Sequence, residues 1–483
     1  MDFGSERSRM LCRPKRDVGL RLSAKGEKQV GLSSRASWNK GLRRVCAAAA
    51  ALWTAQALVV GAAGTAETVP APRLTIVGDH ADGIYAVGQP IHWRVEPGSP
   101  SRFGAATYTL RKGGLDLVRE GKLELASTME EIDATLPAPG TLLLEVKATD
   151  AEGKAVRALA GAVVNPERIQ PSAPRPADFD QFWQAKLEEL AKVPARPQLV
   201  SRESGQTGVD YWQVTMDSIR GTHVRGQLAR PSAGGKLPAL LVVQSSGVYG
   251  LSKAWATDPA AAGWLALGIS AHDLPIDQPP AFYEQQSQGS LADYAAIGND
   301  DREKSSFLRM YLSCYRAAQY LTERPDWDGQ ALLVQGVGQG GLQALITAAL
   351  HPKVSAAIAG VPAGCDLTGP LAGRSPGWPA WCWKTEGKDP AKVLEASRNY
   401  DVVNFASRIK CPVLVSVGLV DETCPPAGIF AALNQMKAPK EIVVLPHGDH
   451  QGSAGSHQAF NDRSRAWQEQ LRLDKPAPVM GAH

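Results

Sequence analysis

Short apolar segments that alternate with helical patterns are the strongest constraint on the fold of this chain. Helical stretches such as 305–322 and 426–436 separate most of these segments. Strands that alternate with helices form a parallel sheet that is buried on both faces. The sequence therefore predicts an α/β domain over residues 175–475. The predicted strands are 240–243, 264–267, 331–334, 356–359, 413–417 and 441–445.

Residues 72–166 show a different pattern of short alternating runs, separated by Gly and Asp clusters. That spacing is typical of a β-sandwich, and we expect one of immunoglobulin type. A spacer or lid is the favoured role for it, ahead of sugar binding. Four prolines between positions 166 and 176 mark its end, and an amphipathic helix is predicted over 177–190. The predicted sandwich strands are 74–77, 91–95, 106–110, 141–146 and 158–164.

Residues 1–66 are predicted to be a basic leader and signal peptide. Two arginines precede an apolar run over 45–63, and small residues follow it up to Ala66. A charged region, an apolar region and a cleavage site in this order are typical of a secretory signal peptide. A transmembrane anchor is the alternative, because the run approaches the ~20 residues needed to span a bilayer. Thr54 and Gln56 make the run weakly apolar, so we expect no stable membrane span, cleavage near Ala66 and export to the periplasm or the medium.

The charge and the cysteines exclude other classes of function. The formal net charge is +4, but residues 1–44 hold twelve Lys or Arg and only four Asp or Glu. The remainder is therefore net negative, and no basic stripe supports binding of nucleic acid. Five of the seven cysteines lie beyond the leader at scattered positions, which indicates no disulfide framework, although one bridge is allowed. No C-x-x-C pair indicates zinc.

The stretch "VQGVGQGG" at 334–341 lies between a predicted strand and the helical pattern at 342–350. A strand, a tight turn and a helix are the context of a nucleophile elbow, whose pattern is G-x-S-x-G. Here the serine position of that pattern holds Gly338. A plain glycine-rich turn is the alternative interpretation.

Two more candidate groups follow predicted strands. Asp421 comes after the strand at 413–417, and His450 comes after the strand at 441–445. In open α/β sheets ligands bind at the carboxyl ends of the strands, so active-site residues are expected there. The order nucleophile, acid, base is the chain order of α/β-hydrolases. His450 would then transfer the proton, and Asp421 would hold the imidazole in its tautomer.

Each of these groups has a rival. Alone, Asp421 is a common loop acid and His450 a common turn histidine. His447 is a rival base, but the turn at Gln451-Gly452 favours an inward His450. Asp449 is a rival acid, yet as the neighbour of His450 it would point elsewhere. A metal site at the two histidines is disfavoured because no other ligands cluster beside them.

An oxyanion hole needs two backbone N–H donors. We expect one from Gln339, directly after the elbow, and the other from the loop at 244–250. Val248 or Tyr249 is the predicted donor in that loop.

Five segments carry a family resemblance: "DFDQFW" at 178–183, "GQGG" at 338–341, "VPAGCD" at 361–366, "GLVDETCPP" at 418–426 and "APKEIVVLPHGDHQG" at 438–452. Together they resemble the acetylxylan esterase and cephalosporin-C deacetylase family of α/β-hydrolases. The resemblance covers roughly three fifths of the chain. It implies an α/β-hydrolase fold and deacetylation of acetylated sugars with no metal or organic cofactor. It also implies Asp421 and His450 as triad members, and it allows a homo-oligomer.

This sequence departs from the family pattern in two places. The family elbow is G-x-S-Q-G-G, so Gly338 stands where the resemblance implies the nucleophilic serine. The oxyanion loop has "SSGV" where many relatives have His-Gly-Tyr. The elbow backbone is strained by about 1–3 kcal/mol for a residue with a Cβ, and glycine relieves that strain. Loss of the serine lowers turnover on the order of a million-fold.

Two hypotheses of function follow. The first is a secreted carbohydrate esterase that is strongly impaired by Gly338, with Ser245, Ser246 or a water activated by His450 as a slow substitute nucleophile. The second is a non-catalytic protein that binds acetylated glycan. Retention of Asp421 and His450 favours the first, because buried ionisable groups are costly without a use. Trp378, Trp381 and Trp383 could offer faces to a sugar in a lid over the pocket, with lid packing or a subunit interface as the alternative.

Overall fold

The computed structural model describes residues 74–98, 103–125 and 129–473. The predicted leader at 1–66 lies outside the described residues. Among those that are described, no helix combines the length and the hydropathy needed to cross a membrane.

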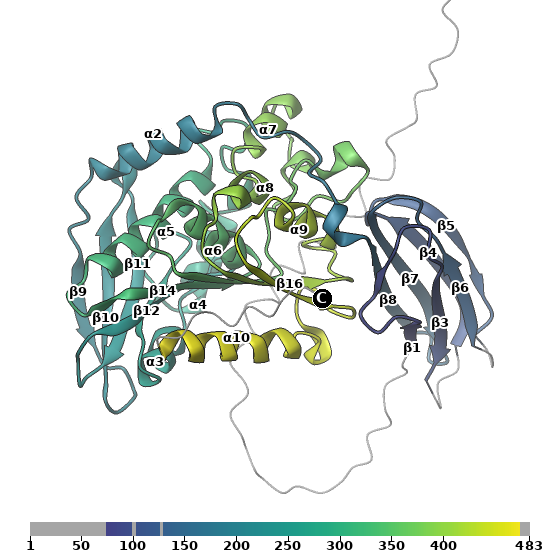
Figure 1. Ribbon diagram of the computed structural model, residues 1–483, viewed down its shortest axis with the longest axis horizontal. Coiled ribbons are helices and arrows are strands. Elements are labelled where there is room, and N and C mark those ends of the chain that lie inside the picture. Colours follow the sequence, from purple (N-terminus) through teal and green to yellow (C-terminus); the bar gives the residue numbers. More distant parts are fainter. Residues whose placement is uncertain (1–73, 99–102, 126–128, 474–483) are drawn as a thin grey trace, which may run out of the picture. The chain divides into compact units, whose positions relative to one another are not determined.

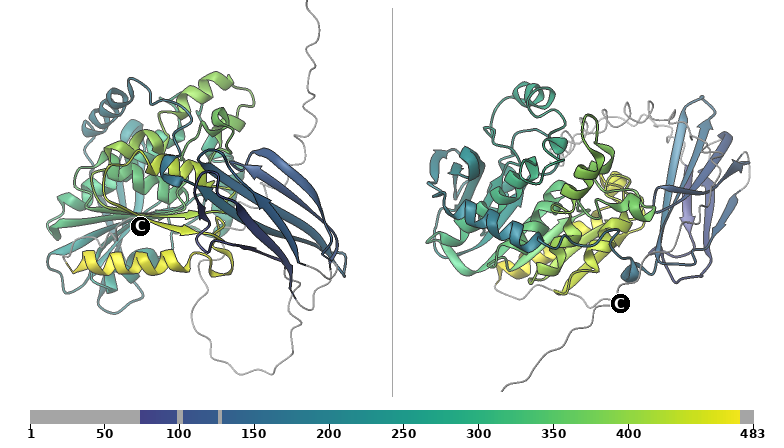
Figure 2. Two further views of the ribbon diagram at one scale, coloured as in Figure 1. Left: turned by 45° about the vertical axis from the view of Figure 1, so that its right-hand side comes forward. Right: turned by 90° about the horizontal axis from the view of Figure 1, so that it is seen from above.

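The N-terminal described region is a sandwich of two sheets (Figures 1 and 2). Alternate side chains, among them Trp93, Leu110 and Leu144, point inward from both sheets into one core. The first, third and sixth strands form one sheet, and the second strand pairs parallel to the last in the other. This arrangement fits the predicted immunoglobulin type. One sheet holds β1 (Leu74–Gly78), β3 (Ile91–Pro97) and β6 (Glu130–Ala134), and the other holds β2 (Ile84–Tyr85), β8 (Ala155–Val164), β7 (Gly140–Asp150), β4 (Phe103–Lys112) and β5 (Asp116–Leu123).

Helix α2 (Phe179–Ala191) contains most of the "DFDQFW" segment. Phe179, Phe182, Trp183 and Leu190 recur at helical spacing and are buried on one face. The Trp183 ring packs against Tyr311, Tyr400 and Phe405, and its Nε1 donates to the Asn399 carbonyl at 3.0 Å. The segment is therefore a structural anchor for the domain that follows.

A nine-stranded sheet forms the centre of the second domain. Its order is β17-β16-β15-β14-β12-β13-β11-β10-β9, and the first six of these strands run parallel. The last three are antiparallel and no prediction covered them, so the sheet is mixed. The strands are β9 (Gln198–Arg202), β10 (Val209–Asp217), β11 (His223–Pro231), β12 (Leu237–Val243), β13 (Leu265–Ile269), β14 (Trp327–Val337), β15 (Ala356–Gly360), β16 (Val413–Gly418) and β17 (Lys440–Leu445).

Helices cover both faces of this sheet (Figure 1). On one face lie α5 (Ser306–Glu323), α6 (Gln339–Leu350) and α9 (Pro426–Leu433), packed in the main core. On the other face α3 (Ala254–Ala261) and α10 (Gln458–Arg472) contribute to a second core, and α10 runs along the sheet (Figure 2, left). Burial on both faces explains why the parallel strands are continuous apolar runs.

Short elements connect these layers. They are η1 (Pro166–Arg168), η2 (Ile219–Gly221), α4 (Pro280–Gln288), η3 (Tyr294–Ala296), η4 (Gly369–Ala372), η5 (Trp381–Trp383), α7 (Pro390–Ser397), α8 (Val402–Phe405), η6 (Ala406–Arg408) and η7 (Ser453–Gly455).

Candidate active site

Gly338 forms the turn between β14 and α6. Its φ is 58° and its ψ is −118°, a conformation that side chains with a Cβ adopt only under strain. Its N–H donates to the Gly360 carbonyl at 2.9 Å, and its carbonyl accepts the N–H of Leu342 at 3.0 Å. The turn is thus held on both sides, by β15 and by the first turn of α6.

The two flanking glycines are required by close packing. A Cβ on Gly336 would lie 2.4 Å from the carbonyl carbon of Gly340. A Cβ on Gly340 would lie 2.6 Å from the carbonyl oxygen of Val243, at the end of β12. The G-x-x-x-G frame therefore lets α6 start directly against two strands, and at these positions it is a requirement of the fold.

Asp421 and His450 meet at the carboxyl ends of β16 and β17. The Oδ2 atom of Asp421 is 2.8 Å from Nδ1 of His450. Its Oδ1 accepts the N–H groups of Thr423 at 2.8 Å and Cys424 at 2.7 Å. Asp421 is 2% exposed. Its carboxylate is therefore fixed in orientation and can stabilise a positive charge on the imidazole.

The surroundings of His450 control its proton affinity. Burial opposes a charged imidazolium, but Cys424 and Asp421 outweigh it and hold the pKa of His450 well above the ordinary value of 6.5. Burial also raises the pKa of the Cys424 thiol, so that group is neutral near pH 7. At neutral pH we therefore attribute the raised pKa of His450 to the Asp421 carboxylate.

The predicted nucleophile position lies against this pair. A Cβ on Gly338 would lie 3.1 Å from Nε2 of His450 and 3.3 Å from Oγ of Ser245. Because Nδ1 of His450 is hydrogen-bonded to Asp421, Nε2 is the ring nitrogen that faces the turn at Gly338. The structure thus brings Gly338, Asp421 and His450 together, and Ser245 of the predicted oxyanion loop lies beside them.

A buried tyrosine links the loop at 244–250 to the elbow. The Tyr294 hydroxyl accepts the N–H of Gly247 at 2.9 Å and donates to Oε1 of Gln339 at 2.6 Å. Nε2 of His272 lies 2.9 Å from the Gly247 carbonyl oxygen. Burial lowers the pKa of His272 to about 4, so the ring is neutral at pH 7 and Nε2 donates to that carbonyl. These contacts fix the loop relative to the elbow.

The predicted oxyanion donors lie on these two segments. Gln339 is the first residue of α6, where backbone N–H groups have no partner within the helix. Val248 and Tyr249 follow Gly247 in the loop, and the Tyr249 carbonyl accepts from Nε2 of Gln244 at 2.7 Å.

The rivals do not join the pair. His447 is exposed. Oδ1 of Asp449 accepts the N–H groups of Gln451 at 3.1 Å and Ser453 at 2.9 Å, so this carboxylate closes the turn after His450. Sequence reasoning missed Tyr294, His272 and Cys424. His272 follows β13, so its place after a strand was an available signal.

The prediction that Trp381 offers a face to a sugar is wrong. Its side chain is 0% exposed, and it packs against Phe307 and Tyr400 while Nε1 donates to the Ala295 carbonyl. Trp378 is half-buried, and its backbone N–H donates to the Thr423 carbonyl at 2.8 Å, beside the Asp421 turn. Trp378 therefore keeps some surface near the site, and Trp383, the third predicted residue, is 58% exposed.

Asp421, Cys424 and His450 are the one group of potential metal ligands found in the described part of the chain, with ligand atoms within 4.8 Å of one another. A metal there would have to displace the proton between Nδ1 of His450 and the Asp421 carboxylate. Both Asp421 oxygens already accept hydrogen bonds. The arrangement therefore fits an acid–base pair better than a metal centre. The five cysteines of the described residues are all free thiols.

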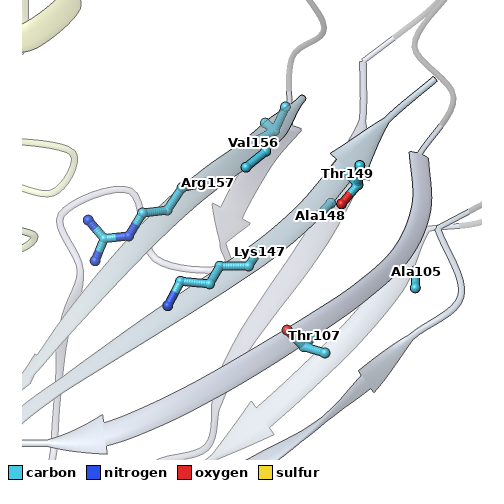
Figure 3. A pocket seen from close by; sticks show the side chains of 8 residues that line it. Ala105, Thr107, Lys147, Ala148, Thr149, Val156 and Arg157 are labelled. Atoms are coloured by element: carbon cyan, nitrogen blue, oxygen red, sulfur yellow. The ribbon is translucent and has the colours of Figure 1, made fainter. Parts of the chain in front are cut away.

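The sandwich carries an open groove away from the candidate site (Figure 3). It crosses β4, β7 and β8, and none of its eight lining residues is aromatic. Its two cations, Lys147 and Arg157, both pair with Glu145. The groove thus offers neither a ring for sugar stacking nor a cation without a partner.

Comparison with known proteins assigns the family. Residues 166–471, more than half of the chain, match the family described as acetyl xylan esterase (AXE1). This chain belongs to the acetyl xylan esterase family. It is 32% identical over 385 residues to the acetyl esterase Axe7A of Xylanibacter ruminicola, across 77% of this chain and 86% of that protein.

Solved structures of acetyl xylan esterases share the fold. The enzyme from Paenibacillus sp. R4 superposes with a TM-score of 0.54 at 25% identity, over 62% of this chain and 98% of that one. Acetyl xylan esterase 1 from Thermoanaerobacterium sp. JW/SL YS485 gives a TM-score of 0.54 at 24% identity, over 63% of this chain and 97% of that one. The α/β-hydrolase fold of this family member is thus established.

Proposed function

We propose that this protein is an exported acetyl esterase for acetylated sugars such as acetylated xylan, with a hydrolytic site that lacks one hydroxyl. The single observation that carries the proposal is the approach of His450 to the elbow. A Cβ on Gly338 would lie 3.1 Å from Nε2, so the Oγ of a serine there, one bond beyond the Cβ, would be within hydrogen-bond reach of its base once the ring moves by a few tenths of an ångström. A protein with no use for this base has no reason to keep a buried, carboxylate-paired histidine beside that turn.

The roles follow from the contacts. In a chain with serine at 338, the hydroxyl would attack the acetyl carbonyl and pass its proton to Nε2 of His450. Asp421 would stabilise the resulting imidazolium. The N–H of Gln339 and that of Val248 or Tyr249 would bind the oxyanion. With Gly338 in place, we expect this double-displacement route to be closed.

Restoring the serine tests the proposal. Gly338→Ser is expected to raise acetate release from 4-nitrophenyl acetate and acetylated xylan roughly a thousand- to a million-fold. The double variant G338S/H450A is the matched control and should return to the starting rate. If G338S gains nothing while its unfolding curve is unchanged, the esterase proposal fails.

The alternative is a non-catalytic protein that binds acetylated glycan, and Gly338 itself favours it. Calorimetric titration of the unaltered protein with acetylated and deacetylated xylo-oligosaccharides separates the two ideas. Tight binding of the acetylated form together with an inactive G338S would support the alternative.

The export part of the proposal rests on the basic and apolar leader alone. Expression of the full chain in a bacterium, followed by N-terminal sequencing of the periplasmic product, tests it directly. A mature N-terminus near residue 67 is the expected result. A full-length chain retained inside the cell would overturn it.

A further inference from the structure

Buried side chains hold both backbone polar groups of Gly247, in the middle of the loop at 244–250. The Tyr294 hydroxyl accepts its N–H at 2.9 Å, and Nε2 of His272 donates to its carbonyl oxygen at 2.9 Å. His272 is 3% exposed and Tyr294 is 8% exposed, so bulk water has little access to either bond. The φ of Gly247 is 118°, a value that glycine adopts readily and other residues do not. The loop is therefore fixed at this residue from two sides.

The bond to His272 also sets the direction of the next N–H in the chain. The Gly247–Val248 peptide is trans, and in a trans peptide the carbonyl and the N–H point in opposite directions. The Val248 N–H therefore points away from the His272 ring. Within the described residues, neither this N–H nor that of Gln339 has a hydrogen-bond acceptor, and no hydrogen bond fixes the peptide that carries the Tyr249 N–H. Of the two loop candidates, Val248 thus has the N–H whose direction is set.

Tyr294 connects the loop to the other predicted donor. Its hydroxyl, which accepts from Gly247, donates to Oε1 of Gln339 at 2.6 Å. Gln339 is 1% exposed, and its Nε2 donates to Oε1 of Gln343 on the next turn of α6 at 2.9 Å. The rings of Tyr294 and His272 meet edge to face, with their centroids 4.5 Å apart. One buried cluster therefore fixes the loop and the start of α6 relative to each other.

We propose that His272 and Tyr294 are positioning residues of the hydrolytic reaction, which direct the Val248 N–H and hold it at a fixed distance from the Gln339 N–H. This inference rests on the proposed function and names the side chains that build its oxyanion hole. Neither side chain touches the substrate. An oxyanion forms in the transition state and not in the bound ester, so a misplaced donor weakens transition-state binding alone. Loss of either side chain should therefore lower kcat and leave KM nearly unchanged.

Variants of the full chain in the G338S background test the inference, with 4-nitrophenyl acetate as the substrate. Tyr294→Phe removes the shared hydroxyl, and we expect kcat to fall roughly ten- to a hundredfold, with KM within about twofold. His272→Leu removes the donor to the Gly247 carbonyl and should lose about as much. His272→Gln keeps an N–H donor at the place of Nε2, so it should retain most of the activity.

Two matched controls separate positioning from stability. Tyr211→Phe removes another buried hydroxyl, which donates to Oε1 of Gln227 at 2.9 Å. His351→Leu removes another buried histidine, whose pKa burial lowers to about 4, as for His272. Both controls should keep the kcat of G338S, whatever they cost in unfolding free energy.

Inhibition by phenylboronic acid gives a second measurement, because its tetrahedral adduct with the serine of G338S resembles the transition state. Its Ki should rise in Y294F and H272L in proportion to the loss of kcat/KM, and it should stay unchanged in the two controls. A Ki that does not follow kcat/KM would overturn the inference.

Three kinetic outcomes would also overturn it. The first is a higher KM at unchanged kcat, the second is a loss of kcat no larger than that of the controls, and the third is an equal kcat for H272Q and H272L. In each case an active G338S leaves the proposed function standing, whereas an inactive G338S removes both. If Y294F does not fold, the comparison of H272L with H272Q decides, and if H272L does not fold, Y294F decides.

Discussion

At the scale of single residues, the histidine is the group whose state decides activity. His450 must be neutral to accept a proton. Its pKa lies above the ordinary 6.5, because the Asp421 carboxylate outweighs the opposing effect of burial. The neutral form is therefore reached only at a higher pH than for an ordinary histidine. Esterase activity of G338S should rise with pH through this raised pKa.

Measurement of kcat/KM against pH checks this prediction. Asp421→Asn should shift the rising limb to lower pH, since burial alone favours the neutral ring. It should also reduce kcat, on the order of ten-thousand-fold if the imidazole takes the wrong tautomer. A rising limb at or below pH 6.5 in G338S would contradict the assignment.

At the scale of elements, the glycines of the elbow have different roles. Gly336 and Gly340 are needed for packing, whereas Gly338 occupies the nucleophile position. Gly336→Ala and Gly340→Ala each place a Cβ within 2.6 Å of backbone atoms. We expect each to cost about 3 kcal/mol or more of unfolding free energy, or to yield no soluble protein. Gly338→Ala meets only side-chain atoms at 3.1 Å or more and should cost about 1–3 kcal/mol of backbone strain. Urea unfolding of the three variants checks the order, and a G338A chain less stable than the other two would contradict it.

The oxyanion loop is predicted to be acid-sensitive. His272 has a folded-state pKa of about 4, below its ordinary 6.5, so between these values the unfolded chain binds the extra proton. Stability therefore falls as pH drops from 6.5 toward 4, by roughly 3 kcal/mol for this residue. Urea unfolding across that range measures the slope. His272→Gln should flatten it, and His447→Gln, an exposed control, should not.

At the scale of the whole molecule, the sandwich contacts the segment that carries the acid. A Cβ on Gly161 of β8 would lie 2.2 Å from the Leu419 carbonyl oxygen, two residues before Asp421. Arg157 of the same strand donates to both carboxylate oxygens of Glu422 at 2.8 Å. Both partners are over 40% exposed, so this pair contributes little energy by itself. The backbone packing at Gly161 is the stronger link.

Gly161→Ala should therefore reduce kcat of the G338S enzyme about tenfold or more, with a smaller change in KM, because it displaces the acid. Gly104→Ala on β4 of the same sandwich is the control, since a Cβ there meets nothing closer than 3.7 Å. Steady-state kinetics with a thermal unfolding curve for each variant make the test. An equal loss of activity in both variants would show that the sandwich acts on stability alone.

The sequence by itself determined the strand, turn and helix at Gly338 and the order of Asp421 and His450 behind two strands. These features depend on local spacing, because period and turn residues fix where each strand ends. The parallel strands could be predicted because burial on both faces makes them continuous apolar segments. The three antiparallel strands β9 to β11 were missed. Of these, β9 at the edge of the sheet is exposed along its whole length, so no buried face marks it in the sequence.

Only the tertiary structure decided which side chains meet. Trp381 looked like a sugar platform in the sequence, but helix α5 and Tyr400 bury it. Tyr294 joins the loop to the elbow, and Ser245 faces the same point as His450. These contacts join segments far apart in the chain. They depend on how faces pack against one another, which no local pattern of residues records.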